Sequence, residues 1–321
     1  GVNPISSGGD VHLEVISRDD PRVGSALVPT DRVAAITMAR CDKPLLLSVP
    51  AGATGVSGVV DVYGEGGTSY EHLVLDVGSQ AEATVVLRHD GSATFAANIE
   101  ILVGDGASLT LVSIQDWDDD AVHVAHHLAR VGRDARFKSV VVTFGGDLVR
   151  IAPTVQFAGA GGEAELLGLY FADAGQHLEH RLLVDHAMPN CRSRVTYKGA
   201  LQGAEAHTVW VGDVVIRADA VGTDTYELNR NLLLTDGARA DSIPNLEIET
   251  GEVVGAGHAS ATGRFDDEQL FYLQARGIPA DAARRLVVRG LFADLIASIG
   301  IPEIAERLTA AVDAELERVG T

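Results

Sequence analysis

Two groups of histidines are the residues whose type and spacing could bind a metal ion. The first group is His123, His126 and His127, and the second is His177 and His180. Imidazole is a good ligand for iron or zinc, and near neutral pH it is largely deprotonated and free to coordinate. Both groups lie in segments with the residue pattern of strands, in which adjacent side chains point to opposite faces. We therefore favour hydrogen-bonded or solvent-facing histidines over a metal site in either group.

An acidic run around Trp117 is a candidate site for a hard cation such as calcium. Carboxylate oxygens are the ligands that calcium prefers. The acidic residues of this run are Asp116, Asp118, Asp119 and Asp120. A solvated loop is the simpler interpretation, because nothing in the sequence marks the catalytic base that a calcium-dependent lyase would also need.

His258 differs from the other histidines because it lies among small residues. The segment 255–263 reads Gly-Ala-Gly-His-Ala-Ser-Ala-Thr-Gly, which we interpret as a loop. Little neighbouring bulk would block access to the imidazole ring there. We take His258 as a candidate ligand, with a histidine that hydrogen-bonds the backbone across a tight loop as the alternative.

The motifs of ordinary enzymes are absent from the sequence. It contains no G-x-x-x-x-G-K-[ST], G-x-S-x-G, C-x-x-C or H-E-x-x-H motif. Any use of ATP would therefore belong to a partner. The two cysteines, Cys41 and Cys191, are too few for an iron-sulfur cluster held by this chain alone, which usually needs about four thiolates. We expect both to be structural.

Composition limits the partners and the compartment. The formal net charge of −20 repels nucleic acid and anionic lipid surfaces. No apolar run reaches the roughly 18 residues of a membrane span, and the start of the chain does not read as a secretory signal. We expect a cytoplasmic protein. Because the chain begins with Gly1 rather than Met, we expect that its N-terminus is trimmed or incompletely represented.

Short β-type runs punctuated by glycine extend from about residue 30 to residue 255. Gly78, Gly104, Gly132 and Gly159 recur at intervals of 26, 28 and 27 residues. Such a period in strand-rich sequence is typical of coils that stack on one another. It predicts a mainly β protein with a right-handed parallel β-helix, whose corner glycines supply positive φ. A β-sandwich with coincidental spacing is the alternative.

The pattern becomes helical after Gly263. Asp266 could cap a first helix that Gly277 ends, and Pro279 opens a second helix that Gly300 ends. A third helix should begin near Pro302. These helices either pack onto the β-helix or offer a docking face to another protein. The chain thus divides into 1–29, which could be the remnant of an N-terminal domain, a β-helix core at 30–263 and a helical domain at 264–321.

Short motifs in a fixed order from Val184 to Phe292 resemble the SufB/SufD family of iron-sulfur cluster assembly scaffolds. They include Tyr-Lys-Gly at 197–199, Pro-Asn-Leu-Glu-Ile at 244–248, the segment that contains His258, and Phe-Tyr-Leu-Gln-Ala-Arg-Gly-Ile at 271–278. Ala259 follows His258 where a SufB-like chain would usually have glutamate, which is more similar to SufD. SufD members often have a cysteine two residues before this histidine, and Ala256 stands there.

The resemblance implies a non-catalytic scaffold in a complex with SufB and with the ATPase SufC. A transient iron-sulfur cluster would form at the SufB–SufD interface, with none bound by the isolated chain, and His258 would offer imidazole to it while the partner supplies thiolate. The implied surface for SufB, or for a homodimer in isolation, includes Asn231, Leu233, Pro244, Leu246 and Ile248. The implied SufC surface includes Phe271, Tyr272, Arg276, Gly277 and Ile278.

Two other functions stay open at this point. A SufB-like or homo-oligomeric subunit that carries its own cluster should need more thiols than Cys41 and Cys191. A calcium-dependent, polysaccharide-active β-helix enzyme would use the acidic run around Trp117.

Overall fold

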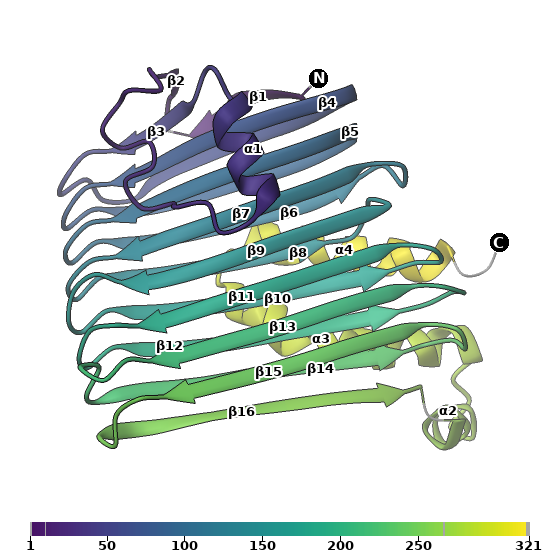
Figure 1. Ribbon diagram of the computed structural model, residues 1–321. Helices are drawn as coiled ribbons and strands as arrows, with labels where there is room; N and C mark the ends of the chain where they lie inside the picture. The colour runs from purple at the N-terminus through teal and green to yellow at the C-terminus, as the bar shows by residue number, and fades with distance from the viewer. Residues whose placement is uncertain (1, 10, 266, 319–321) are drawn as a thin grey trace.

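The chain folds as a parallel β-solenoid of about eight turns with a small helical region near its C-terminus (Figure 1). The computed structural model describes residues 2–9, 11–265 and 267–318. The mainly β, parallel β-helix class predicted from the glycine period is therefore confirmed, and the β-sandwich alternative is wrong.

The elements follow one another in the order of the chain. The strands are β1 Val2–Gly9, β2 Leu13–Val15, β3 Leu45–Val49, β4 Val56–Val77, β5 Glu82–Val103, β6 Ser108–Trp117, β7 Val122–Val131, β8 Arg136–Thr143, β9 Leu148–Phe157, β10 Glu163–Ala172, β11 His177–His186, β12 Arg192–Leu201, β13 His207–Ile216, β14 Thr223–Leu233, β15 Arg239–Ile248 and β16 Val253–Arg264. The helices are α1 Arg32–Arg40, α2 Asp267–Gln274, α3 Ala280–Ile299 and α4 Pro302–Arg318.

Each coil contributes one strand to each of two facing walls. We call β6, β8, β10, β12, β14 and β16 the even wall, and β7, β9, β11, β13 and β15 the odd wall. The long strand β5 joins them, because its first half pairs with β6 and its second half with β7. All these pairings are parallel, and apart from a register shift between Thr223 and Asp224 of β14 they keep one register, so residues one coil apart lie side by side.

Alternate residues of each strand point into the lumen between the walls, where they form one long apolar core. Two buried tyrosines fit there because each faces a glycine. A Cβ on Gly199 would overlap the ring of Tyr170, and a Cβ on Gly168 would overlap the ring of Tyr197. These glycines are thus required by close packing of aromatic rings.

The corner glycines have a different role from the predicted one. Gly78 and Gly104 do not have positive φ; a Cβ on them would lie 2.5 Å from the amide nitrogen of Ala51 and 2.6 Å from that of Ser79, respectively. Positive φ occurs two residues after each corner glycine, as at Gln80 with 60° and at Gly106 with 67°. The glycine period therefore marks the positions at which the backbones of successive coils approach most closely. The prediction of positive φ at these glycines was wrong.

The N-terminal segment is fastened to the solenoid by one buried carboxylate. Glu100 accepts hydrogen bonds from the backbone N–H groups of Gly24, Ala26 and Leu27 at 2.5, 2.9 and 3.0 Å, and its Oε1 lies 2.6 Å from Nε2 of His72. Burial alone would raise the pKa of Glu100, but these hydrogen bonds lower it below its usual value. Residues 24–27 are thus held on the outside of the first coils.

Helices α3 and α4 pack on the outer face of the even wall, behind the strands in Figure 1. Phe292 and Leu295 of α3 and Leu308 of α4 are buried against residues of that wall such as Val140 and Leu169. The predicted starts near Pro279 and Pro302 are confirmed, and Gly300 ends α3 in the left-handed region. Asp266, the predicted cap of the first helix, lies outside the described residues. None of the helices described at 32–40 and 267–318 is long and apolar enough to cross a membrane.

Candidate functional site

His258 lies on the last strand of the solenoid, so the prediction that it lies in a loop is wrong. Residues 253–264 form β16, which pairs in register with β14 despite its many small residues. His258 occupies the position next to Glu227, one coil further along the stack. The imidazole is 41% exposed, and its Nδ1 lies 3.9 Å from Oε1 of Glu227. A strand holds this histidine more rigidly than a loop would, at the open end of the lumen.

Glu227 is a buried carboxyl group that the sequence analysis missed. Its side chain points into the lumen and is 1% exposed, and neither carboxyl oxygen has a hydrogen-bond partner among the described residues. Burial, and then the nearby charge of Asp213, raise the pKa of Glu227 to about 8. No sequence signal marked it, because the glycine period of 26 to 28 residues differs from the 31 residues that separate Glu227 from His258.

The predicted partner surface lies around this end of the solenoid, because β15 and β16 are the terminal strands of the sheet order. Pro244 and Leu246 are half-buried and Ile248 is exposed. Leu233 is also half-buried and packs against the core. Asn231 instead is buried in the lumen, where its Oδ1 accepts a hydrogen bond from Tyr170 at 2.5 Å. Its side chain therefore does not belong to the exposed surface.

The residues predicted to receive an ATPase lie on α2 and the turn that follows it. Phe271 is 72% exposed and Tyr272 is 56% exposed. The guanidinium carbon of Arg276 lies 3.6 Å from the centre of the Tyr272 ring, a cation–π contact that fixes both side chains. Gly277 has a φ of 83°, so the chain can reverse here before Ile278, which is half-buried. An exposed aromatic pair of this kind is typical of protein-binding surfaces.

The histidine groups divide between the two faces of their strands, as predicted. His123 and His127 are buried in the lumen, whereas His126 lies on the outer face. Burial lowers the pKa of His127 to about 3, and that of His180, also in the lumen, to about 3. These rings are neutral packing groups at neutral pH. The expectation of a hydrogen-bonded or solvent-facing ring is wrong for His127, which is buried and whose ring nitrogens have no hydrogen-bond partner among the described residues.

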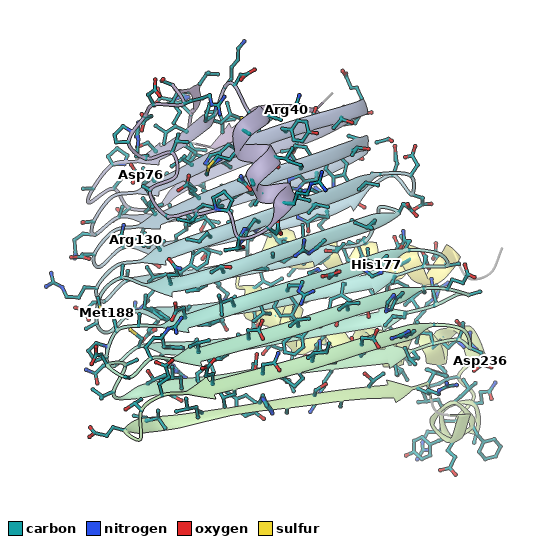
Figure 2. All side chains as sticks on the ribbon, viewed as in Figure 1. Arg40, Asp76, Arg130, His177, Met188 and Asp236 are labelled. Carbon is teal, nitrogen blue, oxygen red and sulfur yellow. The ribbon has the colours of Figure 1, made fainter. Side chains whose placement is uncertain are left out.

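A histidine pair on the outer face of the odd wall was not predicted. Nδ1 of His177, labelled in Figure 2, lies 3.2 Å from Nδ1 of His207. Their Nε2 atoms lie 3.3 Å from Glu179 and 2.9 Å from Asp241, respectively. In-register stacking creates this network from residues about 30 positions apart in sequence.

The acidic run around Trp117 does not converge on a cation site. The carboxylate of Asp116 lies 3.7 Å from Arg307, and that of Asp119 accepts a hydrogen bond from Gln176 at 3.3 Å. Across residues 2–9, 11–265 and 267–318, no three or more His, Cys, Asp or Glu side chains are grouped so that they could hold a metal.

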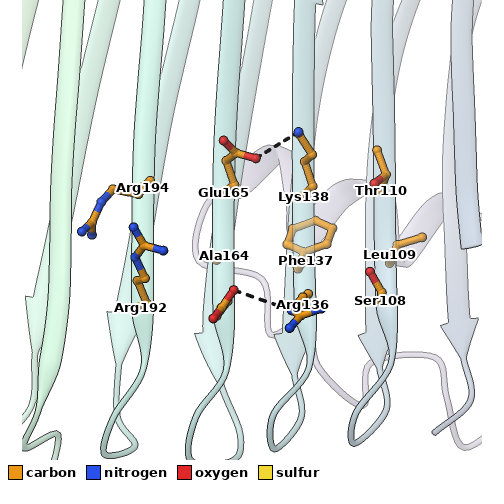
Figure 3. A pocket seen from close by; sticks show the side chains of 11 residues that line it. Ser108, Leu109, Thr110, Arg136, Phe137, Lys138, Ala164, Glu165, Arg192 and Arg194 are labelled. Carbon is orange, nitrogen blue, oxygen red and sulfur yellow. Dashed lines mark ion pairs between the residues drawn. The ribbon is translucent and has the colours of Figure 1, made fainter. Parts of the chain in front are cut away.

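A groove of about 350 Å³ lies on the outer face of the even wall (Figure 3). Its cations are paired within the stack: Lys138 lies 3.0 Å from Glu165, and Arg136 lies 3.7 Å from Glu163. Arg194 lies 2.6 Å from Asp224 of the next coil. The groove is therefore a ladder of compensated charges on neighbouring strands.

Neither cysteine is placed as a reactive thiolate. Cys41 and Cys191 are both buried. Burial raises the pKa of each thiol, which keeps it protonated at neutral pH. The prediction that both are structural is consistent with this placement.

Comparisons with known proteins agree with the resemblance drawn from the motifs. The sequence model of the family described as SUF system FeS cluster assembly, SufBD core domain, matches residues 61–291. An iron-sulfur cluster assembly SufBD family protein of Mycobacterium bovis is 58% identical over 322 residues, which cover 98% of this chain and 81% of that protein. One of Mycobacterium leprae is 53% identical, with 97% and 82% covered.

A second SufBD family protein of Mycobacterium leprae is more distant. It is 27% identical over 248 residues, which cover 76% of this chain but 28% of that protein. The family match covers most of the solenoid and reaches into α3. The chain belongs to the SufBD family of iron-sulfur cluster assembly proteins.

Proposed function

We propose that this protein is a SufD-like, non-catalytic scaffold subunit that works with SufB and the ATPase SufC. Cluster assembly would take place between its terminal coil and SufB, and SufC would supply ATP hydrolysis. The observation that carries the proposal is the position of His258. It is a half-exposed imidazole on the last strand of the solenoid, where a partner can approach it.

The cysteines favour a scaffold over a subunit that carries its own cluster. Both thiols are buried, and both have a raised pKa. Cluster iron is held mainly by thiolates. A cluster at His258 would therefore take its thiolates from the partner, which favours the SufD-like role over the SufB-like alternative.

The exposed surface at the same end supports pairing with another chain. Strands β15 and β16 present unpaired edges, and Ile248 and Val254 there are exposed apolar residues. Exposed edges of this kind are suited to pairing with a second sheet. Mycobacterium leprae has two unlike SufBD family proteins, which fits a pair of different subunits.

The aromatic pair on α2 supports a separate site for SufC. Phe271 and Tyr272 project from a helix that begins just after β16 ends at Arg264. An ATPase bound to α2 would thus lie close in sequence to the strand that carries His258. Movement of that ATPase could be transmitted directly to β16.

The test is anaerobic cluster reconstitution on the complex co-expressed with SufB and SufC. His258→Ala is compared with the wild type and with His12→Ala, a control at an exposed histidine near the other end of the chain. We expect His258→Ala to lose the iron-sulfur absorbance while gel filtration shows an intact complex. An undiminished cluster in the His258→Ala complex would contradict the proposal.

A further inference from the structure

The carboxyl group of Glu227 needs a partner that the described residues do not provide. Both of its oxygens are buried without a hydrogen bond. Buried polar groups nearly always have a hydrogen-bond partner, and an exception calls for an explanation such as an ion. Asp213 does not provide one, since it accepts a hydrogen bond from Asn245 at 2.7 Å. The carboxyl group of Glu227 is therefore free to bind a ligand.

The fold makes room for this carboxyl group. Gly212 faces it from the odd wall, and a Cβ there would collide with Oε2 of Glu227 and with the ring of Trp210. Any other residue at position 212 would displace the carboxyl group from its place. The buried position of the Glu227 carboxyl group therefore depends on the absence of a side chain at Gly212.

The distance to His258 is close to that between two ligands of one metal ion. At 3.9 Å, Nδ1 of His258 and Oε1 of Glu227 are too far apart for a hydrogen bond, which requires about 2.7 to 3.2 Å. Zinc binds nitrogen and oxygen at about 2.0 to 2.2 Å, so two ligands in its tetrahedral geometry lie about 3.3 to 3.6 Å apart, and a shift of about 0.5 Å would bring the two atoms to that spacing. The neighbouring hydroxyl groups already have a partner, because Oγ of Ser260 donates a hydrogen bond to Oγ of Ser242 at 2.7 Å across the terminal coil.

We propose that Glu227 and His258 together form a two-donor site for a divalent transition metal, with ferrous iron as its cargo. Imidazole and carboxylate are suitable ligands for ferrous iron. Glu227 would release its proton to solvent and hold the ion as a carboxylate from inside the lumen, and His258 would hold it at the surface. The remaining coordination positions would be open to a partner's donors, because β16 is a terminal strand of the solenoid. The inference rests on the proposed function, which locates cluster assembly at this end.

The test measures binding of ferrous iron alone to the purified full chain by anaerobic equilibrium dialysis. We expect one bound ion per chain, and at least ~10-fold weaker binding in Glu227→Gln and in His258→Ala, because ligand-shell changes typically cost 10- to 100-fold. The double variant should bind no more weakly than the weaker single variant, since both changes remove the same site. Glu163→Gln, a paired surface carboxylate, is the matched control.

Three further measurements separate a ligand from a structural residue. With manganese(II) as a paramagnetic probe, the nitrogen coupling in the spin-echo spectrum should be present in the wild type and absent in His258→Ala. Gly212→Ala keeps both donors but displaces the carboxyl group, and it should also weaken iron binding. Thermal denaturation should show that Glu227→Gln remains folded, because glutamine has nearly the same shape as a protonated glutamate.

The outcomes distinguish this inference from the proposed function. Wild-type affinity in Glu227→Gln, or no binding of iron by the wild-type chain, overturns the two-donor site even where His258→Ala abolishes the cluster. Iron binding that depends on both residues, together with an undiminished cluster in the His258→Ala complex, supports the site and overturns the scaffold role of His258.

Discussion

The imidazole of His258 lies next to the carboxyl group of Glu227 in the stack of coils, with Nδ1 3.9 Å from Oε1. The imidazole of His258 is partly exposed and the carboxyl group of Glu227 is buried, so the pair extends from the lumen to the surface of the terminal coil. The lumen histidines His123, His127 and His180 are examples of rings that lie further back in the stack, on β7 and β11. The open end formed by β15 and β16 is thus the part of the described chain best suited to cluster chemistry.

A glycine in the lumen should be intolerant of even one added methyl group. Gly199→Ala would force the Tyr170 ring to move, since a Cβ there overlaps it. We expect a loss of about 1 to 3 kcal/mol in the free energy of unfolding, measured by denaturant titration. Gly263→Ala on β16, where a Cβ meets nothing within 4 Å, is the matched control. Equal stability of the two variants would refute this account of the glycines.

The N-terminal segment should depend on Glu100. Glu100→Gln removes a charged acceptor that binds His72 and three backbone N–H groups, of Gly24, Ala26 and Leu27. We expect a loss of about 3 kcal/mol, because hydrogen bonds to a buried charge are costly to break. Limited proteolysis should then cut near residues 24–27. If the variant keeps wild-type stability and protease resistance, Glu100 does not fasten this segment.

The buried histidines predict loss of stability in acid. Burial lowers the pKa of His89 and His186 to about 4, and of His127 and His180 to about 3, whereas histidine in the unfolded chain has its usual pKa of 6.5. Between these values the unfolded state binds more protons, so stability is present above pH 6.5 and is lost as the pH falls toward 4.

Two acidic groups oppose this trend. Burial raises the pKa of Glu71 to about 7 and that of Glu227 to about 8, so each group loses stability as the pH rises from its usual value of 4.5 toward the raised value. The four histidines outweigh the two acidic groups, and we expect the Tm to fall by about 3 to 5 °C between about pH 7 and about pH 5. A Tm that stays constant or rises over this interval in calorimetry would show that these rings are not held neutral by burial.

The aromatic pair on α2 should matter for binding and little for folding. Phe271 and Tyr272 are mostly exposed, so replacing both by alanine should change the free energy of unfolding by less than about 0.5 kcal/mol. If they contact SufC, the double variant should bind that ATPase at least ~10-fold more weakly, because exposed aromatics at interfaces often contribute about 2 kcal/mol. Leu286→Ala, another exposed apolar residue on α3, is the control in calorimetric titration. Unchanged affinity would place the ATPase elsewhere.

The sequence was sufficient to predict the stacked coils and the two long C-terminal helices, because both have a regular period. The strand at His258 was not predicted, since Gly255, Ala256 and Gly257 have low β-propensity. Tertiary pairing with β14 overrides that preference. Glu227 was missed because polar residues occur on both faces of β14, so the sequence pattern does not distinguish a buried polar residue from an exposed one. Which side chains meet across the lumen depends on the coil register, which a single sequence does not specify closely.

Cluster content of the co-expressed complex with SufB and SufC tests the central claim most directly. Wild-type and His258→Ala complexes of equal size by gel filtration are reconstituted anaerobically, and bound iron and sulfide are counted per complex. The account predicts a full complement in the wild type and little or none in the variant. Equal iron and sulfide in both complexes would contradict a role of His258 in holding the cluster.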